Sequence, residues 1–145
     1  MRYDIENQLS VAQAFTGAAT VSTHSYKKQT AAQDLSIGRR MALLVKPTVA
    51  AGAGSTHTLE AIQADDGALT TNVQVIGSST VLAADLKKGS EHEIPIAQGK
   101  MTKQYIGFRH TATGGTTTLT ADVYLVPQDE NAKNTFFPKV VNPEI

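Results

Sequence analysis

The side chains of this chain best suited to metal binding or proton transfer are its four histidines, which are widely separated: His24, His57, His92 and His110. No two of them have the spacing of metal ligands with a third donor nearby. The densest local cluster is Glu91-His92-Glu93. Adjacent residues of a strand point to opposite faces, so His92 is left alone on one side. The sequence therefore predicts a solvated edge strand here and no metal site.

Other patterns that could support catalysis are incomplete. Asp65-Asp66-Gly67 lacks the further oxygen ligands and the closing glutamate of a calcium loop, and it is typical of a turn. The chain has no cysteine and no Gly-x-Ser-x-Gly motif. Its glycine pairs, Gly52-x-Gly54 and Gly114-Gly115, do not open a predicted helix as a phosphate-binding loop would. Two strands could bring Glu60 and Asp122 together as a carboxylate pair, but we expect no enzymatic activity, no metal and no cofactor.

Composition indicates one domain that associates with other proteins. The chain has 145 residues, of which 41% are hydrophobic and 18% charged, and its formal net charge is zero. A neutral surface offers little repulsion between molecules. Nucleic acid is an unsuitable partner because binding it requires a basic surface, and the basic residues here come as isolated pairs. We expect these pairs to be solvated or to protect strand edges: Lys27-Lys28, Arg39-Arg40 and Lys87-Lys88.

The elements expected to position these residues are short strands separated by glycine-containing turns. The clearest is residues 116–126, where Leu119, Ala121 and Val123 alternate with polar residues, as in a half-buried antiparallel strand. Further strands are expected at 41–46, 56–64, 70–76, 91–97 and 104–111, with a weak alternation at 20–26. This spacing predicts an all-β, jelly-roll-like antiparallel β-sandwich.

Several boundaries of these strands follow from local signals. Proline has no N–H to donate to a β-ladder. The strand at 41–46 should therefore fray at Pro47 or lie at an edge, and the strand at 91–97, which contains Pro95, should be an edge strand. Gly77-Ser78-Ser79 is expected to end the strand before it. Residues 80–88 could form a short helix, but we favour a strand and a turn. We expect an irregular N-terminal arm and first strand region at 1–20, a sandwich domain at 21–126 and an extended C-terminal arm at 127–145.

Both ends carry apolar residues that we predict to contact a partner. The C-terminal arm has too much apolar surface for a free disordered tail. Two interpretations stay open: the arm packs over its own core, or it lies on a neighbouring subunit. The predicted interface residues are Leu9, Val11 and Phe15 near the start, and Phe136, Phe137, Pro138, Val140, Val141 and Ile145 near the end.

Several segments resemble the Bordetella-phage-type capsid cement family, and the likeness covers roughly residues 9–126. They are Ser10-Val-Ala-Gln-Ala-Phe-Thr16, Ala42-Leu-Leu-Val-Lys46, Thr58-Leu-Glu-Ala-Ile-Gln63 with Asp65-Asp66, Tyr105-Ile-Gly-Phe-Arg109, the Gly114-Gly115 turn, and Leu119-Thr-Ala-Asp-Val-Tyr-Leu125. The resemblance implies a jelly-roll decoration protein on the outer surface of the expanded head of a tailed bacteriophage. It also implies a homotrimer that contacts the major capsid protein, and that neighbouring cement trimers are further possible partners. The C-terminal arm is longer than the family pattern.

Two other functions are compatible with a small β-sandwich: a receptor- or carbohydrate-binding domain of a phage fibre, and a head–tail connector component. The N-terminus lacks the apolar core of a signal peptide, and no apolar run approaches the roughly 20 residues of a membrane span. We therefore expect synthesis in the cytoplasm and no membrane partner, and the resemblance to the cement family implies that the host is a bacterium and that the final location is the virion.

Overall fold

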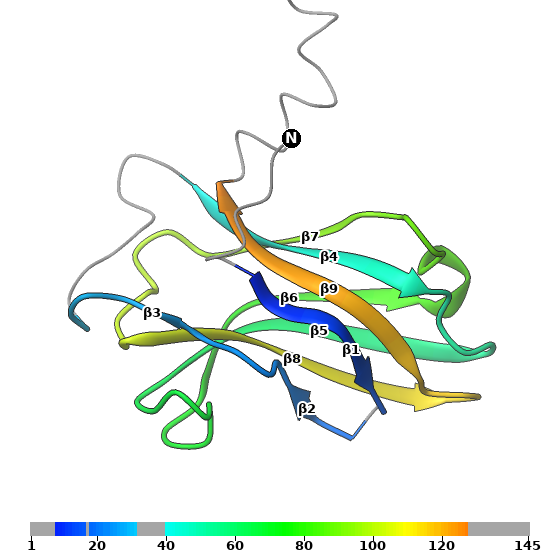
Figure 1. The fold of residues 1–145 in the computed structure, drawn as a ribbon, viewed down its shortest axis with the longest axis horizontal. Coiled ribbons are helices and arrows are strands. Elements are labelled where there is room, and N and C mark those ends of the chain that lie inside the picture. The colour runs from blue at the N-terminus through cyan, green and yellow to red at the C-terminus, as the bar shows by residue number, and fades with distance from the viewer. Residues whose placement is uncertain (1–7, 17, 32–39, 128–145) are drawn as a thin grey trace, which may run out of the picture.

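Two antiparallel β-sheets pack face to face in this protein, whose computed structural model describes residues 8–16, 18–31 and 40–127 (Figure 1). The first sheet has the order β1-β9-β4-β7, and the second has the order β2-β8-β5-β6, with β3 also paired to β8. The all-β antiparallel sandwich predicted from the sequence is confirmed. The strands are β1 (Gln8–Phe15), β2 (Thr20–Val21), β3 (Tyr26–Lys27), β4 (Met41–Val49), β5 (Ser55–Ala64), β6 (Gln74–Leu82), β7 (His92–Pro95), β8 (Tyr105–Gly114) and β9 (Leu119–Pro127).

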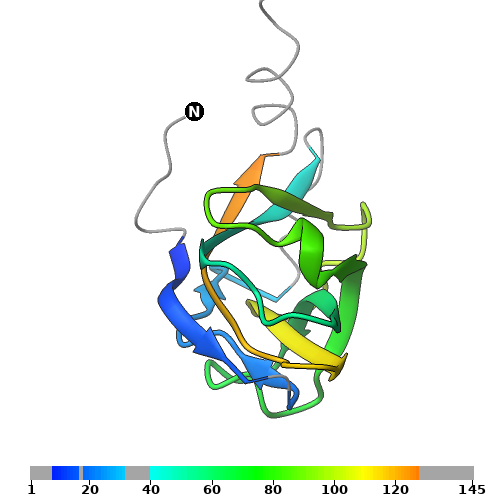
Figure 2. The same ribbon diagram turned by 90° about the vertical axis from the view of Figure 1, so that its right-hand side faces the viewer.

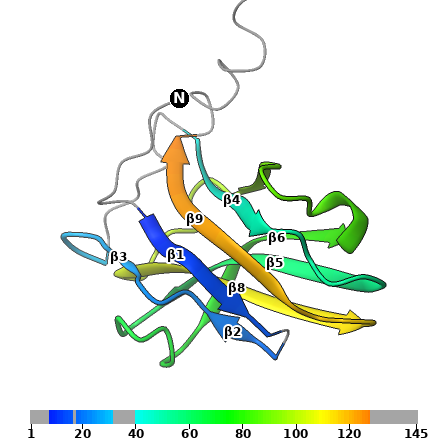
Figure 3. The same ribbon diagram turned by 45° about the vertical axis from the view of Figure 1, so that its right-hand side comes forward.

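The chain changes sheet at most of its connections, so strands far apart in sequence lie side by side. The first and last described strands, β1 and β9, are neighbours, with Gln8 opposite Tyr124 and Phe15 opposite Leu119 (Figure 3). Only β5 and β6 pair as a hairpin of consecutive strands. Seen from the side in Figure 2, the two layers enclose one interior.

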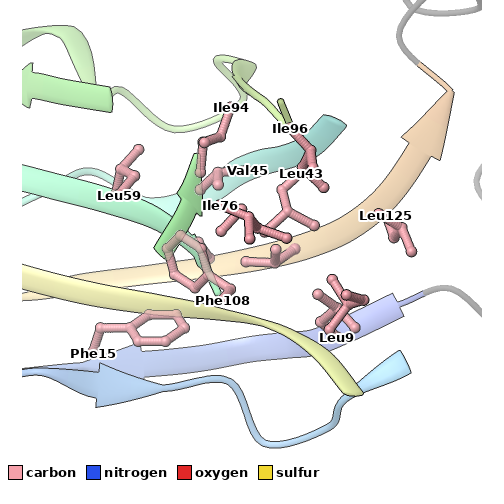
Figure 4. Close-up of a cluster of buried hydrophobic side chains, with 14 of the residues drawn as sticks. Leu9, Phe15, Leu43, Val45, Leu59, Ile76, Ile94, Ile96, Phe108 and Leu125 are labelled. Atoms are coloured by element: carbon pink, nitrogen blue, oxygen red, sulfur yellow. The ribbon is translucent and has the colours of Figure 1, made fainter. Parts of the chain in front are cut away.

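Alternation along the strands builds that interior, as the sequence predicted for β9. Leu119, Ala121, Val123 and Leu125 of β9 are all buried, while the residues between them are half-buried on the outer face. Phe15 and Phe108 meet edge to face, with ring centroids 5.2 Å apart and an interplanar angle of 82°. Figure 4 shows these rings among aliphatic side chains from both sheets. Burying a side chain of this kind contributes roughly 1.5–3 kcal/mol.

Two of three local signals act as expected, and the third, at Pro47, does not. The strand that carries Pro95, β7, lies at the edge of its sheet. Leu82 ends a strand, and a single 3-10 turn follows at Ala83–Asp85, so the strand-and-turn interpretation of this segment is confirmed. At Pro47, β4 neither frays nor lies at an edge: its pairing with β7 stops at Val45, and its pairing with β9 continues through a bulge after Pro47.

The N-terminal segment is more regular than predicted. Residues 8–15 form a full strand of the sandwich, β1, with register shifts near Ser10 and Gln13. At one of these irregularities Ala12 has a φ of 43°, and its amide donates to the Asp122 carboxylate. An irregular ladder of this kind is hard to detect as alternation, which explains why the sequence analysis placed a first strand region within residues 1–20 without giving its bounds.

The strand predicted at 70–76 is displaced towards the C-terminus. The observed strand, β6, begins at Gln74 and continues through Gly77-Ser78-Ser79, where we expected it to end. A register shift relative to β5 at Ala61 and Ile62 accommodates this segment. Gly77 lies against the carbonyl of Pro95, where a Cβ atom would overlap with that backbone. Gly77 therefore permits close approach of β6 and β7 and does not break the strand.

The residues before β6 form a loop that folds back over the outer face of the second sheet. Leu69 is buried in this loop and packs with Ile62 and Ala64 of β5. Its side chain lies over Gly107 of β8, where any larger residue would overlap with it. This small second cluster explains the displaced strand, since the loop is needed to cover Ile62.

Lys28 corrects the expectation that the basic pairs are solvated. Its side chain is buried, and its Nζ atom donates to the carbonyls of Met101, at 2.8 Å, and Ala31, at 3.0 Å. Among the described residues, no helix is long and apolar enough to span a membrane.

Candidate functional surfaces

Of the three interface residues predicted near the N-terminus, two are buried in the sandwich and one is exposed. Leu9 and Phe15 are 1% and 0% exposed and belong to the chain's own core, so their prediction as partner contacts is wrong. Val11 is 64% exposed on the edge strand β1 and remains available. The six residues predicted near the C-terminus lie outside the described residues: Phe136, Phe137, Pro138, Val140, Val141 and Ile145.

Within the part of the chain that the structure describes, three further large apolar side chains are exposed, and the sequence analysis did not single them out. Val75 and Leu82 lie on β6, an edge strand of the second sheet, and Val49 ends β4. Leu82 is 59% exposed. Their only sequence signal was an apolar residue beside a predicted turn, which does not distinguish burial from exposure. Exposed apolar residues on strand edges are typical of surfaces that bind other proteins.

The start of β6 is flanked by two shallow, open grooves. One has a volume of about 490 Å³ and runs between Gly77 and the segment after β7, with Arg40 at its rim. The other, of about 580 Å³, lies between Val75 and the turn at Gly99. Ile76 lines both of them. These grooves are more open than the enclosed pocket in which an enzyme binds a small substrate.

Several threonine side chains lie next to one another on the outer face of the second sheet. Register places Thr80, Thr58 and Thr111 in one row across β6, β5 and β8. Thr56 and Thr113 occupy the next row with Leu82. These residues are exposed or half-buried, so this face is neutral and polar.

On that same face, Glu60 and Arg109 form an ion pair across β5 and β8, with the Arg109 Nε donating to the Glu60 carboxylate at 2.8 Å. Glu60 does not join Asp122, which lies on the other sheet and accepts from the Ala12 amide. The carboxylate pair that the sequence left open is therefore not formed.

A buried cluster of residue types that are common in catalytic sites lies inside the sandwich. Ser55 Oγ donates to the Gly52 carbonyl at 2.8 Å and contacts His57 Nε2 at 2.6 Å. His57 Nδ1 in turn lies 2.8 Å from His110 Nε2. We call these three residues the histidine chain. Ser55, His57 and His110 are all buried.

The Ser55–Gly52 hydrogen bond determines which nitrogen of each imidazole carries a hydrogen. A carbonyl only accepts, so the Ser55 hydroxyl hydrogen is committed to Gly52, and His57 Nε2 must donate to Ser55 Oγ. A neutral His57 then accepts at Nδ1 from His110 Nε2–H. His110 Nδ1 is left as a lone pair with no hydrogen-bond partner. Burial lowers the pKa of His57, and burial together with the neighbouring His57 lowers the pKa of His110 to about 4.

A serine, a histidine and an orienting group are the parts of a nucleophilic triad. Here they cannot act as one, because the serine hydroxyl is buried and bound to a backbone carbonyl. The sequence analysis did not connect His57 with His110. The sequence signal that could have connected them was strand alternation. His57 is two and four positions from the inward residues Leu59 and Ala61, and His110 is two positions from inward Phe108, so both histidines are expected to point into the core.

Asp65-Asp66-Gly67 lies in a turn, as predicted. Asp66 accepts from the amides of Thr70 and Thr71 and from the Thr70 hydroxyl, and these hydrogen bonds lower its pKa. Hydrogen bonds from Asn72 and Lys103 lower the pKa of Asp65. Across the described ranges there is no group of three or more His, Cys, Asp or Glu side chains that could hold a metal ion.

Comparison with models of known protein families finds no match, and neither does comparison with curated proteins.

Proposed function

We propose that this protein is a capsid cement, or decoration, protein of a tailed bacteriophage. In this role it binds the outer surface of the expanded head as a homotrimer and stabilises the junctions between capsomers of the major capsid protein. It performs no reaction. Many modest contacts, multiplied over several capsid subunits, give attachment that is effectively irreversible.

The observation that carries the proposal is the strand order. We infer a jelly-roll topology, because β1-β9-β4-β7 facing β2-β8-β5-β6 is the order expected when two Greek keys interlock. Viral capsid proteins are among the proteins built on this fold. The segments that resemble the cement family fall on five of its strands, β1, β4, β5, β8 and β9.

The surface chemistry also supports a role in protein contacts. Val11, Val75 and Leu82 expose apolar area on β1 and β6, one edge strand of each sheet. An edge strand can add to a sheet of another chain through its backbone. Lectins share the jelly-roll fold, but sugar binding normally uses an exposed aromatic ring. The aromatic side chains of the described residues are buried or half-buried: Phe15, Tyr26, Tyr105, Phe108 and Tyr124. This observation favours the cement over the carbohydrate-binding function.

Sedimentation with expanded, undecorated heads of the source phage tests the proposal. Purified protein should pellet with the heads and saturate near one trimer per local three-fold junction. Unexpanded heads serve as the control and should bind less, because cement recognises the expanded lattice. Absence of binding at micromolar protein would reject the proposal and favour the receptor-binding or connector functions.

A further inference from the structure

The histidine chain lies at one end of the sandwich, where two glycine-containing turns meet. One turn connects β4 to β5 and includes Gly52, and the other connects β8 to β9 through residues 114–118; both lie at the right in Figure 1. The Gly52 amide donates to the Thr118 carbonyl at 3.0 Å, and the Thr116 amide donates to the Ala53 carbonyl at 3.0 Å. Ser55 binds the Gly52 carbonyl from inside. Through Ser55 and Gly52, the histidine chain therefore connects the paired turns with the interior of the sandwich.

Among the residues that the structure describes, those next to the two imidazoles carry no charge that could stabilise an added proton. On their own sheet, Val81 and Ala112 lie beside His57, and Leu59 and Thr20 lie beside His110. The ring of Phe15, from β1 of the facing sheet, also contacts His110. On the facing sheet, the inward positions of β4 and β9 are apolar.

The titratable groups on β5, β8 and β9 that flank the imidazoles in sequence face other directions. Glu60 and Arg109 pair with each other on the outer face, and Asp122 binds the Ala12 amide on the outer side of its sheet. Lys28, the one lysine or arginine that is buried among the described residues, binds the Met101 carbonyl. Met101 precedes β8 by a few residues, whereas His110 lies well along that strand.

Only one nitrogen of the two imidazoles can accept an added proton. Every other nitrogen of the pair is occupied in the hydrogen-bonded chain, so protonation occurs at His110 Nδ1, which has no acceptor facing it. The result is a buried imidazolium with one unbonded N–H, which is far more costly than a neutral ring. Water relieves this cost only if part of the sandwich opens.

We propose that the histidine chain makes the turn end of this sandwich an acid-sensitive latch: uptake of one proton by the two imidazoles opens the paired turns at residues 52–55 and 114–118 while the opposite end stays closed. The turn end is the weakest wall of the site, because Ala53, Gly54, Gly114 and Gly115 are exposed and contribute almost no apolar burial. The inference does not depend on the proposed function.

Amide hydrogen exchange on the full-length protein tests the latch, after correction for the intrinsic pH dependence of exchange. The probes are the Gly52 and Thr116 amides. The reference is the Ile96 amide, which donates to the Met41 carbonyl at the opposite end of the sandwich. If opening returns His110 from a pKa of about 4 to its usual 6.5, the opening constant at the probes rises about twentyfold between pH 7 and pH 5. The reference should not follow.

Three variants make the test specific. In His110→Gln, an amide can still donate to His57 but does not titrate at this site, so the rise should be lost. Ser55→Ala breaks the link to Gly52, so the two probes should already exchange faster at pH 7. His24→Gln, at an exposed histidine, should behave as the wild type.

Equal acceleration of probes and reference would show global unfolding and overturn the latch, as would an unchanged rise in His110→Gln. Should His110→Gln fail to fold, the imidazole NMR signals of the wild type decide the matter. The latch requires His110 to titrate together with opening of the turns, and titration near pH 6.5 with the turns closed would contradict it.

Discussion

Gln63 offers the sharpest test of how the interior is held together. Its side chain is 2% exposed, and its amide makes four hydrogen bonds. It donates to Gln74 Oε1 at 2.9 Å and Thr102 Oγ1 at 3.2 Å, and it accepts from the backbone amides of Thr102 and Lys103 at 2.9 and 3.1 Å. The amide thus joins β5 to β6 and to the segment before β8.

We predict that Gln63→Met lowers the free energy of unfolding by about 3 kcal/mol. Methionine has a similar volume and suits a buried site, so little cavity term is added. Four hydrogen bonds at a net value of about 0.5–1.5 kcal/mol each give about 2–6 kcal/mol. A value in the lower half of this range is expected because Thr102 is exposed and water can replace Gln63 there.

Urea denaturation measures this change as a lower midpoint with an unchanged slope. The matched control is Gln74→Met, which removes one of the four bonds from an exposed side chain and should cost at most about 1 kcal/mol. If Gln63→Met were no more destabilising than Gln74→Met, the argument that the Gln63 amide stabilises this region would be refuted.

Three further outcomes are expected. The pKa of His110 is about 4 in the folded protein and 6.5 in the unfolded chain, so burial of the neutral imidazole stabilises the fold fully above about pH 6.5, and this contribution is lost as the pH falls to about 4. Equilibrium unfolding should detect a decrease of about 3 kcal/mol in the free energy of unfolding over this range. In His110→Gln no decrease should be attributable to this site. Gly107→Val should displace Leu69 and cost about 1–3 kcal/mol by thermal or urea unfolding, whereas Gly67→Ala, which meets no atom closer than 3.4 Å, should be nearly neutral. Removal of residues 128–145 should weaken trimer formation in analytical ultracentrifugation or shell binding in co-sedimentation, and unchanged behaviour in both assays would rule out a role for the arm.

Strict alternation made part of this fold predictable from sequence. In β9, inward Leu119 and Val123 alternate with outward polar residues, and the observed strand follows that pattern. Pro95 correctly marked an edge strand, since a residue without an N–H is tolerated there. These signals are local, which is why a single sequence contains them.

Other features depend on contacts between distant segments. Gly77 looks like a strand breaker until β7 is known to approach it, and the loop before β6 is fixed by Leu69 lying over Gly107. Lys28 is buried because carbonyls that include that of Met101, far along the chain, surround its ammonium group. None of these partners lies near its counterpart in sequence.

The candidate site was even less predictable. His57 and His110 are 53 positions apart, so no motif spacing joins them. Leu9 and Phe15 were expected at an interface because an apolar residue in an irregular segment resembles an anchor, but the bulged strand β1 carries both into the core. Exposed Val11 on the same strand shows how a one-residue change in phase decides between core and surface.

Cement function is tested most directly by the mechanical strength of the shell. DNA-filled heads that lack decoration should be heated with and without the purified protein, and rupture followed by the fluorescence of a DNA-binding dye. We predict that saturating protein raises the rupture temperature and that heads carrying part of the full complement show an intermediate value. Heads that bind the protein fully but rupture at the temperature of bare heads would contradict the proposal that this protein is a capsid cement.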